Sequence, residues 1–392
     1  MTLLDVPRIA LDPFTYETIP DNLQIMSEAL AQAPVCWLEP YGVYVTGRHA
    51  LAQVMFKEWE VFTSTVKAFG EREFIRKTLV QEDPPDHGRV RKPMMSLFSP
   101  LALKEYDAYF RAEAETMADE IVAMGEVDGV EDIAARYVLK VFPDILGVID
   151  MDRPRLLPWA DLAFNSNVPG NQIFLDCKAR SGDVLEWFAH QMRRENFRPD
   201  SMGGQIFRMA DEGILSLEDA QTLVVIIFSA GFDTTILAIG NGLKLLADNP
   251  DQWDRLREAP ELVRTAFEET LRMEPPARTV GRGVTRDTDL WGVPLRAGDK
   301  VASFLNVVGR DPAVWDDPDA FRVDRRKVLG HMAFGAGVHA CAGQALSRME
   351  YSAIIGALVS RVRRIEPTGP AERKINNNAS GFARVPLRLI PA

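Results

Sequence analysis

A single cysteine in a glycine-rich stretch constrains the fold of this chain more than any other feature. Residues 334–343 read FGAGVHACAG, and a helical pattern follows over residues 344–362. Glycines allow tight turns with positive φ and let backbone N–H groups approach a sulfur atom closely. The start of a helix adds a positive potential. The stretch therefore predicts a Cys341 thiol with a lowered pKa that is suited to bind a metal, and a buried structural cysteine beside a turn is the alternative.

A long apolar segment, residues 216–247, carries polar groups where a buried helix should have none. Ser216 and Asp219 resemble a capping box at its start. Around its middle the segment is apolar nearly all round, so the helix must be buried. Residues 231–235, GFDTT, insert a glycine, an acid and two hydroxyls there. Because a buried acid costs free energy unless it is paired, several local rules broken at one place indicate a functional site.

The rest of the chain reads as helices with a few short strands, without a linker, repeat or low-complexity run. We therefore expect one domain over residues 1–392. Apolar periodicity and turn residues give the element boundaries. Helices are predicted over residues 21–33, 49–56, 101–123, 130–147, 184–195 and 260–274, and hairpins over residues 35–45 and 376–382.

Charge and cysteine usage exclude some classes of protein. The net charge of −11 argues against nucleic acid as a partner, because nucleic-acid binding needs a basic face. The three cysteines are scattered and odd in number, so we expect no disulfide framework and a reducing, cytoplasmic location. Residues 1–16 contain neither a signal peptide nor an apolar anchor, and we expect no membrane association.

Four motifs, in order along the chain, resemble those of the cytochrome P450 superfamily. They are Asp-Pro-Pro-x-His-x-x-x-Arg at residues 83–91, Ala-Gly-x-Asp-Thr-Thr at residues 230–235, Glu-x-x-Arg at residues 269–272, and Phe-x-x-Gly-x-His-x-Cys-x-Gly at residues 334–343. The chain resembles the soluble bacterial members. The resemblance implies a mainly α fold with small β-sheets, a buried haem b whose iron is ligated by Cys341, and a monooxygenase reaction.

The same resemblance assigns further haem contacts. It implies that Phe334 packs near the sulfur and that Gly335, Ala230 and Gly231 border the cofactor. Side chains expected at the haem propionates are His87, Arg91, Arg282 and His339. An arginine suits this role because its planar fork matches a carboxylate. The residues alone leave a surface His–Arg pair as the alternative for residues 87 and 91.

The polar insertion in the long segment matches the family's acid–alcohol pair. The resemblance implies that Asp233 and Thr234 are catalytic: Thr234 hydrogen-bonds O2 and Asp233 relays protons from solvent. It also implies that Gly231 gives room for O2, with Ala230 and Ile226 on the pocket side one helical turn apart. The structural alternative is a Thr234 hydroxyl bonded to its own helix and an Asp233 paired with a surface arginine.

Glu269 and Arg272 share one face of the helix predicted over residues 260–274. Alone, such a pair is usually exposed and contributes little to stability. The resemblance implies a buried structural pair that ties this helix to the segment before the cysteine. We expect Arg325 to be its third partner.

The substrate pocket is also assigned by resemblance, including the loop over residues 63–81. The pocket residues expected are Phe164, Ile226, Ala230, Val280 and Gly281. Phe174 is expected in the core. The chain resembles bacterial enzymes that oxidise para-substituted benzoic acids, including by O-demethylation of an aromatic compound.

One feature of that group differs here. Val225 and Ile226 are apolar where the benzoate-oxidising enzymes have polar residues that help to hold the carboxylate. A carboxylate would therefore need Arg72, Arg76 or Lys77. The expected substrate is a small aromatic molecule, and a neutral terpenoid or another apolar molecule is the alternative.

The expected electron source is a separate protein. No Gly-x-Gly-x-x-Gly follows a predicted strand, so we expect a [2Fe–2S] or similar ferredoxin with its NAD(P)H-dependent reductase. Arg89, Lys92 and Arg348 are basic residues that could dock an acidic ferredoxin. Two other classes stay open, a haem-thiolate peroxygenase and a haem-based gas sensor. The acid–alcohol pair argues against the first, and the lack of length for an output domain argues against the second.

Overall fold

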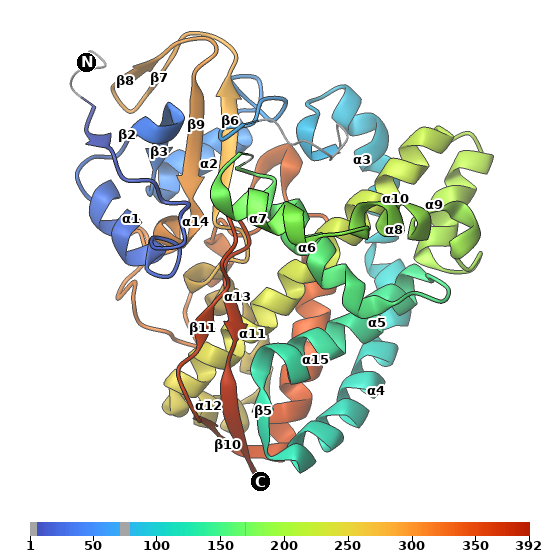
Figure 1. Ribbon diagram of the computed structural model, residues 1–392. Coiled ribbons are helices and arrows are strands. Elements are labelled where there is room, and N and C mark those ends of the chain that lie inside the picture. Colours follow the sequence, from blue (N-terminus) through green and yellow to red (C-terminus); the bar gives the residue numbers. More distant parts are fainter. Residues whose placement is uncertain (1–5, 71–78, 169) are drawn as a thin grey trace.

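A computed structural model describes residues 6–70, 79–168 and 170–392 (Figure 1). The predicted mainly α fold with small sheets is confirmed. Its α-helices are α1 (Asn22–Leu30), α2 (His49–Lys57), α3 (Asp86–Leu97), α4 (Pro100–Met124), α5 (Arg136–Leu146), α6 (Leu156–Asn165), α7 (Gln172–Arg180), α8 (Val184–Gln191), α9 (Met202–Asp211), α10 (Leu217–Gly231), α11 (Asp233–Asp248), α12 (Pro250–Glu258), α13 (Val263–Met273), α14 (Leu305–Val308) and α15 (Gln344–Arg361).

The strands form one larger sheet and three small ones. They are β1 (Arg8–Ile9), β2 (Cys36–Leu38), β3 (Val43–Thr46), β4 (Phe62–Thr63), β5 (Glu126–Asp128), β6 (Thr279–Val284), β7 (Thr288–Leu290), β8 (Val293–Leu295), β9 (Lys300–Phe304), β10 (Val362–Pro367), β11 (Glu372–Arg373), β12 (Phe382–Arg384) and β13 (Pro386–Pro391). Strand order in the larger sheet is β1-β2-β3-β9-β6-β4, so the sheet combines strands of the N-terminal region with β6 and β9 from residues 279–304. Strand β3 runs parallel to β9, and β9 runs antiparallel to β6.

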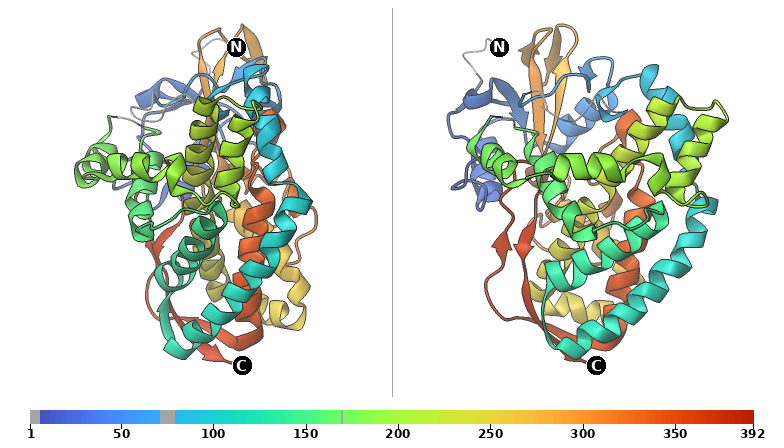
Figure 2. Two further views of the ribbon diagram at one scale, coloured as in Figure 1. Left: turned by 90° about the vertical axis from the view of Figure 1, so that its right-hand side faces the viewer. Right: turned by 45° about the vertical axis from the view of Figure 1, so that its right-hand side comes forward.

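Helices make up the part of the molecule away from the larger sheet. Helix α15 packs along α4, and both run side by side in the left view of Figure 2. Helix α11 lies among α13, α15 and the π-helical turn Gly129–Ala135, which precedes α5. The segment predicted as one helix over residues 130–147 is therefore a π-helical turn followed by α5. Buried apolar side chains of these helices form the largest core cluster.

The long central segment is helical as predicted, but it is broken into α10 and α11 at Phe232. Ser216 and Asp219 form the expected capping box at its start. At the break, the hydroxyls of Thr234 and Thr235 donate to the carbonyl oxygens of Ala230 and Gly231, at 2.8 and 3.0 Å. Hydroxyl donors of this kind compete with the regular helical ladder. The polar insertion thus coincides with a local opening of the helix.

Among the described residues, this α10–α11 segment is the stretch long and apolar enough to cross a membrane. Two-thirds of its most apolar part, 67%, is buried inside the protein. A core helix of this length has the same composition as a membrane span.

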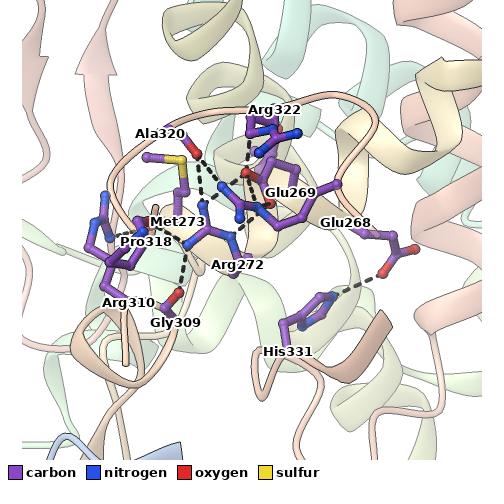
Figure 3. A network of polar contacts seen from close by, with 12 residues as sticks. Glu268, Glu269, Arg272, Met273, Gly309, Arg310, Pro318, Ala320, Arg322 and His331 are labelled. Carbon is purple, nitrogen blue, oxygen red and sulfur yellow. Dashed lines mark hydrogen bonds and ion pairs between the residues drawn. The ribbon is translucent and has the colours of Figure 1, made fainter. Parts of the chain in front are cut away.

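Glu269 of α13 lies at the centre of a buried polar network (Figure 3). Arg272 donates to it from Nε at 2.7 Å and from Nη2 at 2.8 Å. The Nε of Arg325 is 2.8 Å from its Oε1, which confirms the predicted third partner. Both arginines also donate to main-chain carbonyls of the loop over residues 309–320. A buried charge pair is favourable only when its remaining donors are satisfied, as they are here.

The neighbouring Glu268 points to the segment that contains the cysteine. Its carboxylate lies 2.9 Å from His331 Nε2 and accepts from Arg348 Nε at 2.5 Å. Arg348 also lies over the ring of Phe334, 4.9 Å from its centroid. Helix α13 therefore binds the chain on both sides of residue 341, at His331 before it and at Arg348 after it.

Replacing Glu269 by glutamine should destabilise the protein by about 3–5 kcal/mol, because two buried guanidinium groups lose their counter-charge. Urea unfolding followed by far-UV circular dichroism measures the loss. E126Q is the control: it removes the partner of Arg388 in a pair that is largely exposed, so its effect should be small. Equal losses for both variants would contradict a central role for the Glu269 network.

Candidate active site

An interior cavity of about 400 Å³ lies between the α10–α11 break and the glycine-rich loop. Its walls come from α3, α5, α6, α10, α11, α13, β6 and α15 as well as from that loop. A second hollow of about 490 Å³ lies beside α9, between Arg194 and Asp211. This second hollow contains none of the predicted site residues, so the chemistry belongs to the interior cavity.

The glycine-rich loop presents Cys341 to the cavity. The N–H of Cys341 donates to the carbonyl of Phe334 at 2.8 Å, which closes the loop. Gly335 and Gly337 have φ of 66° and 70°, a region that favours glycine. A Cβ at Gly337 would lie 2.5 Å from the carbonyl oxygen of Phe56, so the loop must approach α2 as bare backbone. Cys341 is exposed only in the sense that it faces the interior cavity.

The expectation of a lowered Cys341 pKa is wrong for the thiol itself. Burial raises its pKa above the ordinary value. The N–H groups of Gly343 and Gln344 and the charges of Arg91 and Arg348 act in the opposite direction without reversing it. The loop geometry was predicted correctly, but desolvation outweighs it. A metal cation is the stronger influence, because a coordinating thiol is deprotonated outright.

Four basic side chains gather at one edge of the cavity. Arg282 and Arg91 line it, and the rings of His87 and His339 lie 4.5 Å apart between centroids. Burial lowers the pKa of Arg282 to about 10, and burial also lowers the pKa of both histidines. Asp83 is the nearby carboxylate, 3.5 Å from His339 Nε2.

Part of this basic edge is not used by the protein. Within the described ranges, the buried Nε2 atom of His87 makes no hydrogen bond, and that of His339 has only the long 3.5 Å contact with Asp83. Arg91 donates to the carbonyl of Ala340, and Arg282 Nη1 donates to Gly281 O at 2.9 Å. Buried polar atoms without partners are rare in folded proteins. A thiol, apolar walls and an edge of arginine and histidine N–H donors fit a flat apolar group that carries a metal and carboxylates, as haem does.

The acid and the alcohol at the helix break have different environments. Thr234 lines the cavity, as expected for a catalytic residue. Its hydroxyl donates to a carbonyl of its own helix, as expected from the structural alternative. Asp233 is buried and points away to Lys374, whose Nζ is 3.6 Å from Oδ1. Its partner is a lysine of the C-terminal region, so the alternative of a surface arginine is wrong. Burial raises the pKa of Asp233, although Lys374 lowers it in part.

Most expected pocket residues line the cavity. Those that do so are Phe164, Ile226, Ala230, Gly231, Thr234, Val280, Phe334 and Gly335. The prediction that Gly281 lines the pocket is wrong. Gly281 faces Ala68, because neighbouring residues in a strand point to opposite faces. A Cβ at Gly231 would lie 2.1 Å from the ring of Phe142, so the space beside this glycine is filled by that ring.

The loop expected over the cavity is described only in part. Phe69 packs on the rings of Phe14 and Tyr41, away from the cavity. Phe174 is in the core, as expected. Arg72, Phe74, Arg76 and Lys77 lie outside the described residues.

Two charged residues near the site were missed by sequence reasoning. Glu350 lines the cavity from α15, and its side chain is buried. An acid on the apolar face of that helix was the sequence signal that could have indicated a buried charged residue at this site. Lys374 follows the short strand β11, and nothing in the local sequence marks it.

Comparisons with known proteins agree with this geometry. A profile of the cytochrome P450 family matches residues 188–390. The chain is 36% identical to "Cytochrome p450 CYP199A2" of Rhodopseudomonas palustris, over 99% of this chain and 95% of that protein. It is 26% identical to the "Biotin biosynthesis cytochrome P450" of Bacillus subtilis, over 82% and 83% of the two chains. The crystal structure of CYP109E1 from Bacillus megaterium in complex with testosterone superposes with a TM-score of 0.85 at 24% identity, covering 95% of this chain and 99% of that chain.

Replacing Glu350 by glutamine should stabilise the protein increasingly as pH rises. Burial holds the pKa of Glu350 well above its ordinary value of 4.5, and the hydroxyl of Thr235 lowers it only in part. The stability that Glu350 contributes to the wild-type protein is therefore fully present below pH 4.5 and is lost as the pH rises through the folded-state pKa of this carboxyl. Urea unfolding at about pH 5 and about pH 8 measures the difference.

Glu274 is the matched control for this test. Burial acts to raise the pKa of Glu274, but Arg373, Arg310 and Arg278 together lower it. Its stabilisation is present above the ordinary carboxyl pKa, so E274Q should destabilise the protein at both pH values. If E350Q behaved as E274Q does, Glu350 would have a partner that stabilises its charge.

Proposed function

Because the chain belongs to the cytochrome P450 family of monooxygenases, whose haem b iron is ligated by cysteine, we propose that Cys341 is the ligand and that the protein inserts one atom of O2 into a small apolar substrate. The observation that supports this most directly is the Cys341 thiol opening into a cavity beneath the break in the central helix. When bound, haem supplies the iron that activates O2.

The described residues provide a site for each part of the cofactor. Arg91, Arg282, His87 and His339 would hold the propionates, since their donors gather at one edge and the buried Nε2 atom of His87 has no acceptor in the described residues. Phe334 and Gly335 would border the porphyrin on the side of the sulfur. The cationic edge also offsets the negative charge that two carboxylates bring into the interior.

Thr234 and Asp233 would manage protons. Thr234 lies at the cavity wall, where rotation of its hydroxyl away from the Ala230 carbonyl would direct it into the cavity that receives O2. Asp233 begins α11 behind this wall, and its Oδ2 has no hydrogen-bond partner within the described ranges. A buried carboxyl whose pKa is raised above its ordinary value is suited to take up and release a proton.

The walls of the cavity support an apolar substrate. Phe164, Ile226 and Val280 line it, and none of these side chains offers a polar atom to a carboxylate. We therefore favour a small aromatic substrate, oxidised by hydroxylation or O-demethylation. A neutral terpenoid fits the same walls. A benzoate would depend on Arg72, Arg76 or Lys77, outside the described residues.

Reducing electrons would come from a ferredoxin with its reductase. Of the three basic residues expected at the docking face, Arg89 pairs with Asp219 and Arg348 pairs with Glu268. Lys92 is exposed on α3, so it is the residue best placed to meet an acidic partner. We place the protein in the cytoplasm, since Cys36, Cys177 and Cys341 are not paired in disulfides.

Replacing Cys341 by serine tests the proposed ligand. Wild-type protein, reduced under carbon monoxide, should show the red-shifted Soret band typical of thiolate-ligated haem, and C341S should lose that band and its monooxygenase activity. C177S, which removes a buried cysteine of α7, is the control and should keep the band. Retention of the band by C341S would rule out residue 341 as the ligand.

Spectral titration tests the substrate class. A small neutral aromatic ether such as 4-methoxytoluene should displace water from the site and shift the ferric Soret band toward high spin. Titration with 4-methoxybenzoate distinguishes the carboxylate alternative. A stronger shift with the benzoate would show that a cation outside the described residues binds the carboxylate. A shift with monoterpenes alone would exclude the aromatic substrate.

A further inference from the structure

The ammonium group of Lys374 lies between two carboxylates that come from different helices. Its Nζ is 2.7 Å from Oδ1 of Asp161 in α6 and 3.6 Å from Oδ1 of Asp233 at the start of α11. Lys374 follows β11, and its backbone N–H donates to Gly381 O at 3.0 Å, so the hairpin fixes where the side chain starts. One positive charge is thus shared by two acids.

These three side chains lead from the surface to the interior. Exposed fractions fall from 43% for the Asp161 side chain to 16% for Lys374 and 1% for Asp233. In the described part of the chain, Lys374 and Asp161 are the charged groups that act on Asp233. Burial and the charge of Asp161 disfavour the ionised form of Asp233, and Lys374 favours it. The position of the one ammonium therefore shifts the balance between the two forms.

Helix α6 connects this arrangement to the wall of the cavity. Asp161 lies one turn before Phe164, which lines the cavity. The backbone carbonyl of Asp161 also accepts from Asn376 Nδ2 at 3.2 Å, close in sequence to Lys374. A molecule that presses on Phe164 therefore acts on the same helix that holds Lys374 away from Asp233.

We propose that Lys374 is a positioning residue for proton delivery: Asp161 holds its ammonium away from Asp233, and movement of α6 transfers the ammonium toward Asp233. This inference rests on the proposed role of Asp233 in the monooxygenase. It makes the charge of the proton carrier depend on the state of the cavity wall. Proton delivery and substrate occupancy would then be coupled through one lysine.

Infrared titration of the haem-loaded protein tests the proposal. The carbonyl stretch of protonated Asp233 is assigned by its loss in D233N and followed against pH. K374Q should move the titration midpoint up by about 1 pH unit or more, because the favourable charge is gone. D161N should move it down by a similar amount, because Lys374 is released to Asp233 and a repelling charge is removed.

Two controls separate this role from a purely structural one. K244Q removes a lysine of α11 that pairs with Asp248, and it should leave the midpoint unchanged. K374R keeps the positive charge, so its titration midpoint for Asp233 should lie close to that of the wild type. Shifts in the same direction for K374Q and D161N, or no shift in either, would overturn the proposal. The infrared signal does not depend on turnover. Failure of the proposed function, seen as a wrong substrate or an absent thiolate band, is therefore measured separately from failure of the Lys374 proposal.

Turnover gives a second readout. D161N and K374Q should both increase, by at least about twofold, the fraction of electrons released as hydrogen peroxide. K374Q removes the shared ammonium group, and D161N removes one of the two carboxylates that share it. Equal coupling in wild type and both variants would contradict a role in proton delivery, even if the midpoints moved.

Discussion

Two adjacent acids on α13 hold the framework on which the site depends. Glu269 binds Arg272 and Arg325 and thereby fixes the loop over residues 309–325, while Glu268 binds His331 and Arg348 on either side of the cysteine loop. These carboxylates are buried, so their partners cannot be exchanged for water without a large loss of stability. The position of the thiol follows from this polar framework more than from apolar packing.

The central helix shows the opposite use of polarity. Its capping box and apolar faces are those of an ordinary core helix, yet it opens at Phe232, where two hydroxyls bond to preceding carbonyls. Among the residues that the structure describes, the buried acid beside this opening has one ammonium, that of Lys374, as its counter-charge. A charge satisfied only in part is unfavourable for stability, and such groups are found where a protein needs a proton carrier.

The sequence predicted those parts of the site that local patterns encode. Cys341, the basic pair on α3, the acid–alcohol pair and the Glu269 network all belong to short motifs, and each was brought to the expected neighbourhood. Gly281 was misplaced because its strand register decides which neighbour faces the cavity. The lowered thiol pKa was wrong because desolvation depends on the whole fold. Lys374 and its two acids meet only through tertiary packing, which no local spacing reveals.

The close approach of Gly337 to Phe56 has a consequence for how the molecule assembles. Together with the contacts of Arg91 to Ala340 and of Asp83 to His339, it joins the first quarter of the chain to residues 337–340. Contacts across such long sequence separations carry a large loop-closure entropy and form after local structure. A newly made chain would therefore complete the glycine-rich loop last. Binding of the cofactor would then coincide with the final closure of the fold and would not precede it.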